Sequence, residues 1–480
     1  MKSDIPFSQL MQDRVGCWGG RPRPRGPGVR RGIRPTFLVL SLLFRATTIP
    51  AEVPGTYAIR DARIVRVSGP PIEHGTVVIR DGLIESVGED INAPAGAWVI
   101  EGKGLTVYPG LIDALSTWGL PGAVSTSSTL ARGSVARTVT PPQTPAAGPE
   151  DRPSNTSYLR AADQISATSS NIELARNAGF TTAVSFPTSN IFAGQGAVIN
   201  LAGDRTGQMV IESPAGLYLS VRPSGFTSYP GSLMGVFAYI RQIYLDAAQY
   251  KLAKAIYDKH PQGLHRPAYD RTLEGVIESP RVLLPARRAV EIDRMLKFAS
   301  ELKVKPVLYG GDEAYRAVDL LKKSGVPVLI SLKWSERNKD ADPATDEPLR
   351  VLEMREKAPG GPAALAKGGV RFAFYSDGIA IPKDVTKNLK KALDAGLSAE
   401  DAIRAFTLSA AEIYGVADRL GSIDKGKIAN VVVSDGDLFQ EKTKIKYVFI
   451  DGRKFDMPPD IAEAKPETKT ELKPDAEKIP

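Results

Sequence analysis

The sequence is poor in the residue types that most often form covalent cross-links or hold metal ions. It contains one cysteine, Cys17, and three histidines among 480 residues. A disulfide within the chain is therefore excluded, and a site made of several histidines has few residues from which to form. The sequence also lacks any run of about 18 apolar residues, the length that a membrane-spanning helix needs. We therefore expect no integral membrane span.

Net positive charge is scarce outside the first 50 residues. Residues 1–50 contain nine Lys or Arg and two acidic residues, so this leader carries almost all of the formal charge of +8. The rest of the chain is close to neutral, which argues against a nucleic-acid partner.

The leader has the three regions of a secretory signal. An Arg-rich stretch, "GVRRGIRP", precedes the short apolar run "TFLVLSLLF" and the small residues of "RATTIPAE". Arg30 and Arg31 form a twin-arginine pair, and the pattern predicts export to the periplasm. The alternative is a disordered basic tail on a cytoplasmic protein.

Two segments at opposite ends of the sequence are typical of antiparallel β-structure. "YAIRDARIVRV" and "GTVVIRDGLIESVG" alternate polar and apolar residues, and Asp81-Gly82 predicts a tight hairpin. "GKIANVVVSDGD" and "KIKYVFIDGRKF" repeat the pattern near the C-terminus. We expect the two segments to pair in one β-sandwich satellite domain.

The central region alternates apolar strands with amphipathic helices. The expected strands are "GFTTAVSF", "RVLLPA", "KPVLYGG", "VPVLISL" and "VRFAFYSDG", and the expected helices include "EIDRMLKFASEL", "DEAYRAVDLLKKSG" and "DAIRAFTLSAAEIYG". This order predicts a (β/α)₈ TIM-type barrel, with a doubly wound open sheet as the alternative. In a barrel, the C-terminal ends of the strands form the active face.

These patterns predict five parts of the chain. They are a leader (1–50), the first part of the β-sandwich (51–106), a barrel (107–419) with a low-complexity insertion (120–158), the second part of the β-sandwich (420–456) and a disordered tail (457–480).

Several motifs resemble the amidohydrolase superfamily, in its imidazolonepropionase-like branch. They are "VYPGLIDA", "NAGFTTAV", "VRFAFYSDG" and the long block "DAGLSAEDAIRAFTLSAAEIYGVADRLGSIDKGKIANVVVSDGD". The resemblance implies a barrel whose strand ends hold one or two divalent metals, usually zinc, which activate water to hydrolyse C–N bonds. It also implies a His-x-His pair just after "PGLID" and an Asp on the last strand.

Most of the implied metal ligands are missing from this sequence. Leu115 and Thr117 stand at the positions of the paired histidines, and neither replaces an imidazole. Later strand ends carry Pro285, Tyr309 and Ser331. The three histidines lie elsewhere: His74 falls in the expected satellite sheet, and His260 and His265 fall in a Pro/Gly-rich loop.

Asp377, in "YSDG", matches the Asp of the last strand. It is our one candidate catalytic residue, either as a ligand or acid/base group or as a structural carboxylate, whereas Asp113 is expected to support the first loop. Tyr309, Lys333, Trp334, Arg287 and Arg288 lie near strand ends and are candidates for binding an anionic or planar ligand. Ser376 has no histidine nearby in the sequence and no nucleophile elbow around it, so we expect no serine hydrolase.

Three hypotheses follow. The first is an inactive or strongly altered amidohydrolase that binds a small ligand or a partner, with no cofactor. The second is an active C–N hydrolase with an atypical single-metal site around Asp377, in which zinc is the expected ion. The third is a scaffold for a metal-complete amidohydrolase partner chain. A homo-oligomer is compatible with all three.

Overall fold

A computed structural model describes residues 55–121, 152–223, 228–337, 340, 342, 344, 346–379 and 382–457. The chain divides into two units, Met1–Glu52 and Val53–Pro480, and all described residues belong to the second. The leader, most of the insertion 120–158 and nearly all of the predicted tail lie outside the described residues, so their assignments stay predictions. No helix within the described ranges is long and apolar enough to cross a membrane.

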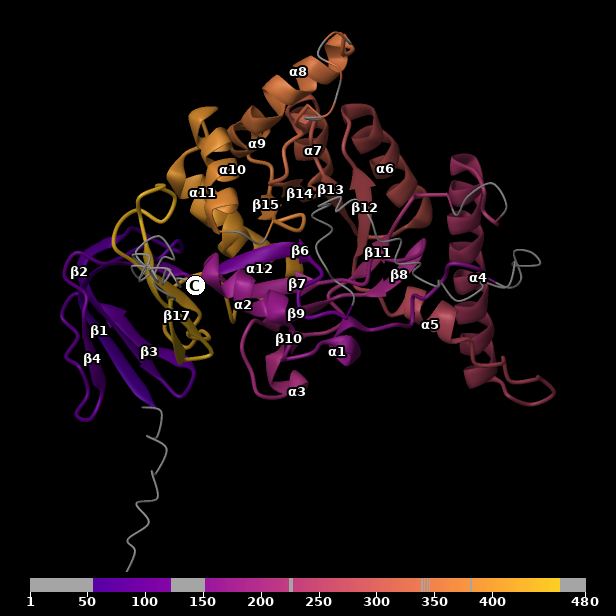
Figure 1. Cartoon of the computed structure of the whole chain (residues 1–480). Coiled ribbons are helices and arrows are strands. Elements are labelled where there is room, and N and C mark those ends of the chain that lie inside the picture. Colours follow the sequence, from indigo (N-terminus) through magenta and orange to yellow (C-terminus); the bar gives the residue numbers. More distant parts are fainter. Residues whose placement is uncertain are drawn as a thin grey trace, which may run out of the picture. The chain divides into compact units, whose positions relative to one another are not determined.

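The first and last β segments form one eight-stranded sheet (Figure 1). Its strands are β1 (Thr56–Ile64), β2 (Ile72–Arg80), β3 (Leu83–Gly88), β4 (Trp98–Glu101), β5 (Thr106–Pro109), β16 (Val431–Ser434), β17 (Ile445–Ile450) and β18 (Arg453–Asp456). The order is β18-β17-β16-β5-β1-β2-β3, with β4 beside β1. The expected pairing of the two ends is therefore present. The sheet is continuous rather than split into the two layers of a sandwich, because β5 pairs with both β1 and β16.

The predicted Asp-Gly turn is confirmed. Asp81 and Gly82 link β2 to β3 with φ values of 51° and 81°, and Arg80 pairs with Leu83 across the turn. Asp451 and Gly452 form the same kind of turn between β17 and β18, with φ values of 52° and 72°. Two consecutive residues at positive φ define the type I′ hairpin, which Asp-Gly favours.

The central region contains two further sheets. One has four strands in the order β10-β9-β7-β6, and the other has six in the order β15-β14-β13-β12-β11-β8. The strands are β6 (Leu111–Ser116), β7 (Phe180–Ser185), β8 (Phe192–Gln195), β9 (Ala197–Asn200), β10 (Val210–Glu212), β11 (Leu217–Leu219), β12 (Val282–Ala286), β13 (Pro306–Gly310), β14 (Val328–Ser331) and β15 (Phe372–Tyr375). All five predicted central strands are present.

The fold is mixed α/β, and its central sheets do not close into the predicted barrel by hydrogen bonding. β11 to β15 are parallel, as are β6 and β7, but β8 and β9 run antiparallel to their neighbours. The short connection from β7 to β8 contains no helix, and without a crossover helix the chain returns in the opposite direction. β8 and β9 are separated only by Gly196, so this segment passes from one sheet to the other.

Helices surround the parallel strands (Figure 1). They are α1 (Ala161–Gln164), α2 (Ser170–Asn177), α3 (Thr206–Met209), α4 (Leu233–Lys259), α5 (Arg271–Ile277), α6 (Ala289–Leu302), α7 (Val318–Ser324), α8 (Leu349–Lys357), α9 (Gly361–Gly368), α10 (Pro382–Asp394), α11 (Ala399–Phe406) and α12 (Leu408–Tyr414), with 3₁₀ turns η2 (Ala314–Arg316) and η3 (Ala358–Gly360). The helix predicted over 401–415 is broken at Thr407, whose φ of −129° is not helical.

Alternate residues of the parallel strands belong to two different apolar clusters. Leu284, Leu308, Val328 and Phe374 pack in the cluster that contains Ile292 and Phe298 of α6. Leu283, Val307, Leu329 and Ala373 pack in a second cluster. That cluster also includes Leu115 of β6 and Tyr414 of α12. The second cluster therefore packs residues of the two central sheets together, as the two-residue period of a strand allows.

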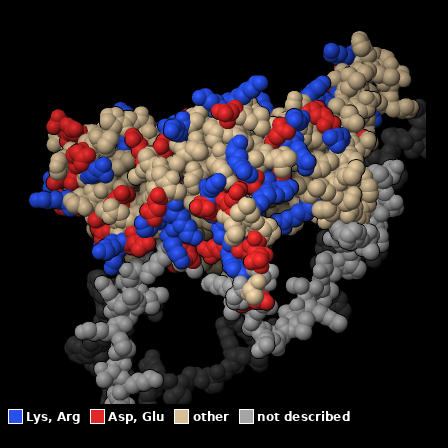
Figure 2. Space-filling model, turned by 90° about the horizontal axis from the view of Figure 1, so that it is seen from above, with Lys and Arg blue, Asp and Glu red and all other residues tan. Residues whose placement is uncertain are grey.

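Charged side chains of both signs mingle on the exposed surface. Figure 2 shows Lys and Arg interspersed with Asp and Glu over the described part of the face in view. This distribution agrees with the nearly neutral composition of the chain beyond its leader.

Candidate functional site

The C-terminal ends of β11 to β15 bring several polar side chains to one edge of the six-stranded sheet. Tyr309 lies in β13, Ser331 ends β14 and Asp377 follows β15 by two residues. The strands are parallel and adjacent, so their C-terminal ends meet at the same edge. We call this edge, with Tyr218, Arg287, Tyr309, Asp312, Ser331, Tyr375 and Asp377, the strand-mouth site.

Asp377 is exposed and has one hydroxyl partner. Its φ is 51°, in the left-handed region that Asp adopts more readily than most residues. The Ser331 hydroxyl donates to Asp377 Oδ2 at 3.0 Å, and the backbone N–H of Lys333 donates to Ser331 Oγ at 3.0 Å. The carboxylate is thus oriented by β14 and can accept further hydrogen bonds.

Three tyrosines lie at the same edge of the sheet as Asp377. The rings of Tyr218 and Tyr309 stack with centroids 5.1 Å apart, and the Tyr309 hydroxyl donates to the carbonyl of Leu219 at 3.1 Å. Burial raises the pKa of Tyr218 and Tyr309 above the ordinary value. The pKa of Tyr375 is raised by burial and further by the negative charge of Asp377. All three phenols therefore stay neutral near physiological pH and present hydrogen-bonding hydroxyls.

Arg287 and Asp312 add an ion pair to the strand-mouth site. Arg287 Nε donates to Asp312 Oδ2 at 2.8 Å, and the Arg287 side chain is 59% exposed while that of Asp312 is 13% exposed. The pKa of Asp312 is raised, mainly by burial and further by the negative charge of Asp377, whereas the charge and hydrogen bond of Arg287 lower it. Burial lowers the pKa of Arg287, but Asp312 outweighs this effect and the pKa is raised overall.

The other predicted ligand-binding residues lie differently. Trp334 is 8% exposed and packs in the core, where its indole N–H donates to the carbonyl of Asn388 at 2.8 Å. Arg288 precedes α6 and bonds Glu291 at 2.6 Å, one helical turn away. Lys333 is exposed just beyond β14. Pro285 pairs with Tyr309 and offers no polar side chain. These contacts indicate that Trp334 packs in the core and that Arg288 caps α6, and not that either side chain binds a ligand.

Leu115 and Thr117 occupy the end of β6, where the resemblance implies the His-x-His pair. Leu115 is 7% exposed and packs in the same apolar cluster as Tyr375, with Tyr218 and Tyr309 against it. The region between the sheets is therefore filled by apolar and aromatic side chains on the β6 side.

The histidines lie away from the strand-mouth site. His74 is in β2, where its Nδ1 lies 2.9 Å from Asp61. His260 caps the C-terminus of α4, and His265 is in an exposed loop. Within the described ranges, no group of three or more His, Cys, Asp or Glu side chains is arranged to hold a metal ion.

Asp113 connects β6 to β15, although no ladder joins these strands. It is fully buried, and Oδ1 accepts the backbone N–H of Ser376 at 2.9 Å. Oδ2 accepts the Ser376 hydroxyl at 2.5 Å and the Trp118 indole N–H at 2.7 Å. Burial raises the pKa of Asp113 to about 6, and the hydrogen bonds from Ser376 and Trp118 oppose this shift. Ser376 is therefore committed to a structural carboxylate.

The sequence analysis missed Tyr218, Tyr375 and Asp312. β11 is only three residues long and has no strand signature, so nothing indicated Tyr218. Tyr375 had a usable signal, because a residue two positions before Asp377 on a strand points to the same side. Asp312 follows the glycines of "VLYGG", which mark the end of β13.

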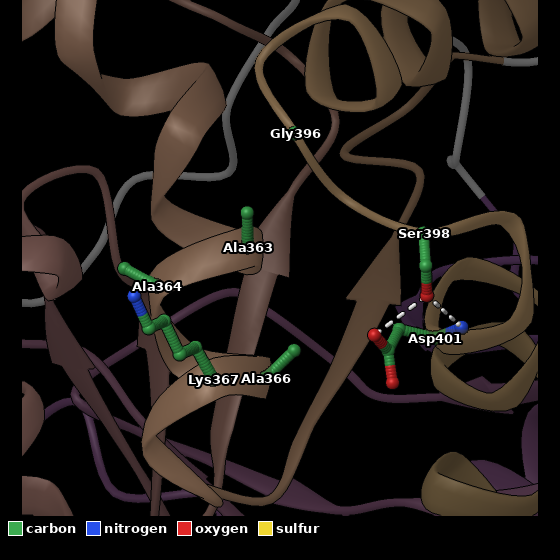
Figure 3. A pocket seen from close by; sticks show the side chains of 7 residues that line it. All are labelled: Ala363, Ala364, Ala366, Lys367, Gly396, Ser398 and Asp401. Carbon is green, nitrogen blue, oxygen red and sulfur yellow. Dashed lines mark hydrogen bonds between the residues drawn. The ribbon is translucent and has the colours of Figure 1, made fainter.

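A separate cavity of about 380 Å³ lies among the outer helices (Figure 3). It lies between α9 and the start of α11, with Lys367, Ser398 and Asp401 as its polar residues. The Ser398 hydroxyl accepts the backbone N–H of Asp401 at 3.0 Å and donates to its carboxylate at 2.6 Å, so both cap α11. α9 leads into the first residue of β15, whereas Asp377 follows the last. The cavity is therefore at the opposite end of this strand from the strand-mouth site.

Comparisons with known proteins show similarity to one family. The sequence profile of the Amidohydrolase family matches residues 321–455. The crystal structure of an amidohydrolase from Thermotoga maritima MSB8 is similar, with a TM-score of 0.67 and 26% identity, over 83% of this chain and 100% of that chain. An uncharacterized protein matches with a TM-score of 0.50 and 17% identity, over 84% of this chain and 100% of its own. A Xaa-Pro dipeptidase matches with a TM-score of 0.49 and 16% identity, over 84% and 100%. No curated protein matches the sequence significantly.

The chain is similar to the amidohydrolase superfamily in the sequence of residues 321–455 and in its fold over most of its length. This is a family of hydrolases that act on carbon–nitrogen bonds, many of them with metal ions such as zinc.

Proposed function

We propose that this protein is an altered amidohydrolase, of the imidazolonepropionase-like branch, that binds a small ligand at the strand-mouth site without a histidine-held metal pair. The observation that carries the proposal is the packing of Leu115 in one apolar cluster with Tyr375, Tyr218 and Tyr309. A leucine has no lone pair with which to coordinate an ion, and Leu115, 7% exposed, is packed among apolar and aromatic side chains instead.

The side chains at the strand-mouth site do not fit a zinc site. Its oxygens belong to two carboxylates, Asp312 and Asp377, and to neutral hydroxyls. Asp312 is engaged by Arg287, and the raised pKa values of the tyrosines oppose the deprotonation that a strong metal–phenolate bond needs. Zinc prefers three or four nitrogen, sulfur or carboxylate ligands. A metal-activated water is therefore not part of the proposed function.

The chemistry of the site suits a planar polar molecule. Asp377 accepts a hydrogen bond from a ligand N–H, and the exposed guanidinium of Arg287 can donate to a carbonyl oxygen or attract negative charge. The aromatic rings of Tyr218 and Tyr309 provide flat apolar surface beside these groups. An amide or a cyclic amide has this combination of groups.

Metal analysis of the purified protein tests the proposal. After growth with zinc and manganese, we expect less than one metal per ten chains and no thermal shift on adding either ion. Asp377→Ala is compared with Asp418→Ala, a change at an exposed carboxylate that ion-pairs only weakly with Arg419. Stoichiometric metal that is lost in Asp377→Ala but kept in Asp418→Ala would establish the alternative, a hydrolase with a single metal at Asp377.

We also propose that the leader directs export, on the basis of Arg30, Arg31 and the apolar run after them. Expressed with its leader in a bacterial host with two membranes, the protein is expected in the periplasmic fraction and shortened at its N-terminus. Changing both arginines to lysine should retain it in the cytoplasm at full length. Full-length cytoplasmic protein in both cases contradicts the proposal.

A further inference from the structure

The sequence contains four Asp-Gly pairs, which begin at Asp81, Asp377, Asp435 and Asp451, and no Asn-Gly pair. An Asp-Gly bond is chemically labile, because glycine has no side chain that keeps its backbone nitrogen away from the neighbouring carboxyl group. The four pairs consist of the same two residues. A large difference in their reactivity therefore has to come from the fold.

Asp81-Gly82 and Asp451-Gly452 are held in hairpins. A pair of residues on the flanking strands closes each turn. The two turns also pack on each other, since a Cβ placed on Gly452 would lie 2.7 Å from the Cα of Gly82, and a Cβ placed on Gly82 would lie 3.0 Å from Asp451 Oδ1. Neither turn can therefore change its backbone without disturbing a ladder and the other turn.

Asp435-Gly436 is held through its carboxylate. The backbone N–H of Lys444 donates to Asp435 Oδ1 at 2.7 Å, and Lys446 Nζ lies 3.1 Å from Oδ2. Thr443 Oγ1 lies 3.0 Å from the position of a Cβ placed on Gly436. Both carboxylate oxygens are thus bound, which keeps the carboxyl carbon from approaching the Gly436 nitrogen.

Asp377-Gly378 forms the same kind of turn with less support. Its φ values are 51° and 82°, and the backbone N–H of Ile379 donates to the carbonyl of Ser376 at 3.1 Å. The turn follows β15 and leads to α10 rather than to a second strand, so no ladder closes it. Asp377 and Gly378 are both exposed, and a Cβ placed on Gly378 would meet no described atom within 4 Å.

We propose that Asp377-Gly378 is a site of spontaneous isoaspartate formation in the folded protein, and that the fold protects the other three Asp-Gly pairs. The reaction requires the backbone to rotate until the glycine nitrogen reaches Cγ of the aspartate, and a segment opens most readily where few contacts hold it. The turn at Asp377 can open alone, because no ladder and no second turn depends on it. The reaction involves no ligand, so the proposal does not rest on the proposed function.

The reaction consumes no reagent other than water. The Gly378 nitrogen attacks Cγ of the protonated Asp377 carboxyl group, a bond forms between them, and the carboxyl hydroxyl leaves with the amide proton as water. Water then opens the succinimide ring. Cleavage of the new bond restores aspartate, whereas cleavage of the original peptide bond gives isoaspartate, whose free carboxylate is the former backbone carbonyl group. The carboxylate thus changes its position relative to Ser331 at the strand-mouth site.

Peptide mapping of the full-length protein tests the proposal. The protein is incubated for several weeks at physiological temperature and pH and then cleaved after Lys and Arg, which places each Asp-Gly pair in a different peptide. Chromatographic retention and electron-transfer fragmentation distinguish isoaspartate from aspartate. We expect isoaspartate to accumulate at Asp377 at least about fivefold faster than at each of the other pairs, the factor expected where a hydrogen bond has to break before a turn opens.

The same protein in guanidinium chloride is the control for local sequence. Once the chain is unfolded, the four pairs should react at rates within about threefold of one another. Asp377→Glu keeps the carboxylate but requires a larger ring for the attack, so the modified peptide should disappear. Equal rates at the four pairs in the folded protein, a faster reaction at another pair, or no isoaspartate at Asp377 overturns the proposal. So does an excess at Asp377 that persists in the unfolded chain, because local sequence would then explain it.

Discussion

Two carboxylates, Asp113 and Asp377, lie next to Ser376, and one is buried while the other is exposed. Asp113 binds Ser376, which is 1% exposed, whereas Asp377 is the next residue along the chain and is exposed. Asp113 accepts three hydrogen bonds from Ser376 and Trp118, whereas Asp377 accepts one from the described part of the chain, donated by Ser331. The end of β15 thus has two different environments: Ser376 is held in the core by Asp113, and Asp377 is open to solvent, where we propose that a ligand binds.

The cost of burial explains why these roles cannot be exchanged. A buried carboxylate needs several donors to offset its loss of water, and Asp113 has them in Ser376 and Trp118. Asp377 keeps its contact with water and its left-handed φ of 51°. We propose that its remaining lone pairs accept hydrogen bonds from a ligand.

The largest expected effect is the loss of stability when Asp113 is removed. Asp113→Ala leaves the backbone N–H and hydroxyl of Ser376 and the indole N–H of Trp118 without their acceptor, in a buried position. Each such group costs about 1–3 kcal/mol, so we expect a decrease in the free energy of unfolding on the order of 4 kcal/mol. Urea denaturation measures it.

Asp377→Ala is the matched change on the other side of the comparison. Its exposed side chain loses one hydrogen bond, so the expected decrease is about 1 kcal/mol. Equal decreases for the two variants would contradict the division of roles between Asp113 and Asp377.

Much of the fold was predictable because its signals are local. The turn at Asp81 requires residues that accept positive φ, which Asp-Gly does. The continuous apolar runs of the central strands predict strands that are buried on both faces. The reversal at β8 and β9 was not predictable, since "FAGQGAVIN" indicates a strand but not its direction. The break at Thr407 depends on tertiary packing and has no strong local signal.

The candidate site was predictable only in part. Asp377 and Tyr309 were identified because they end clear strands. Trp334 follows a strand end equally closely, but its indole packs against α10, and no sequence pattern distinguishes these two outcomes. Tyr218 comes from a strand too short to recognise. Ser376 donates two hydrogen bonds to Asp113, a residue far away in the sequence. This contact could therefore not be predicted without the structure.

A further expected effect is a pH dependence of stability that the buried carboxyl of Asp113 introduces. Burial raises its pKa to about 6 from the ordinary 3.8, so the folded protein binds a proton that the unfolded chain has already released between these values. This contribution is fully present below about pH 4 and is lost as the pH rises through 6, at about 1.4 kcal/mol per unit of pKa shift, or roughly 3 kcal/mol in all. Other carboxylates, such as Asp270 and Asp424, have lowered pKa values and lose their stabilisation mainly at lower pH.

Subtracting the profile of Asp113→Asn, which cannot titrate at this position, isolates the contribution of Asp113. We expect the difference in unfolding free energy between wild type and variant to shrink from pH 4 to pH 7, and a difference that grows with pH would show that the hydrogen bonds from Ser376 and Trp118 outweigh burial.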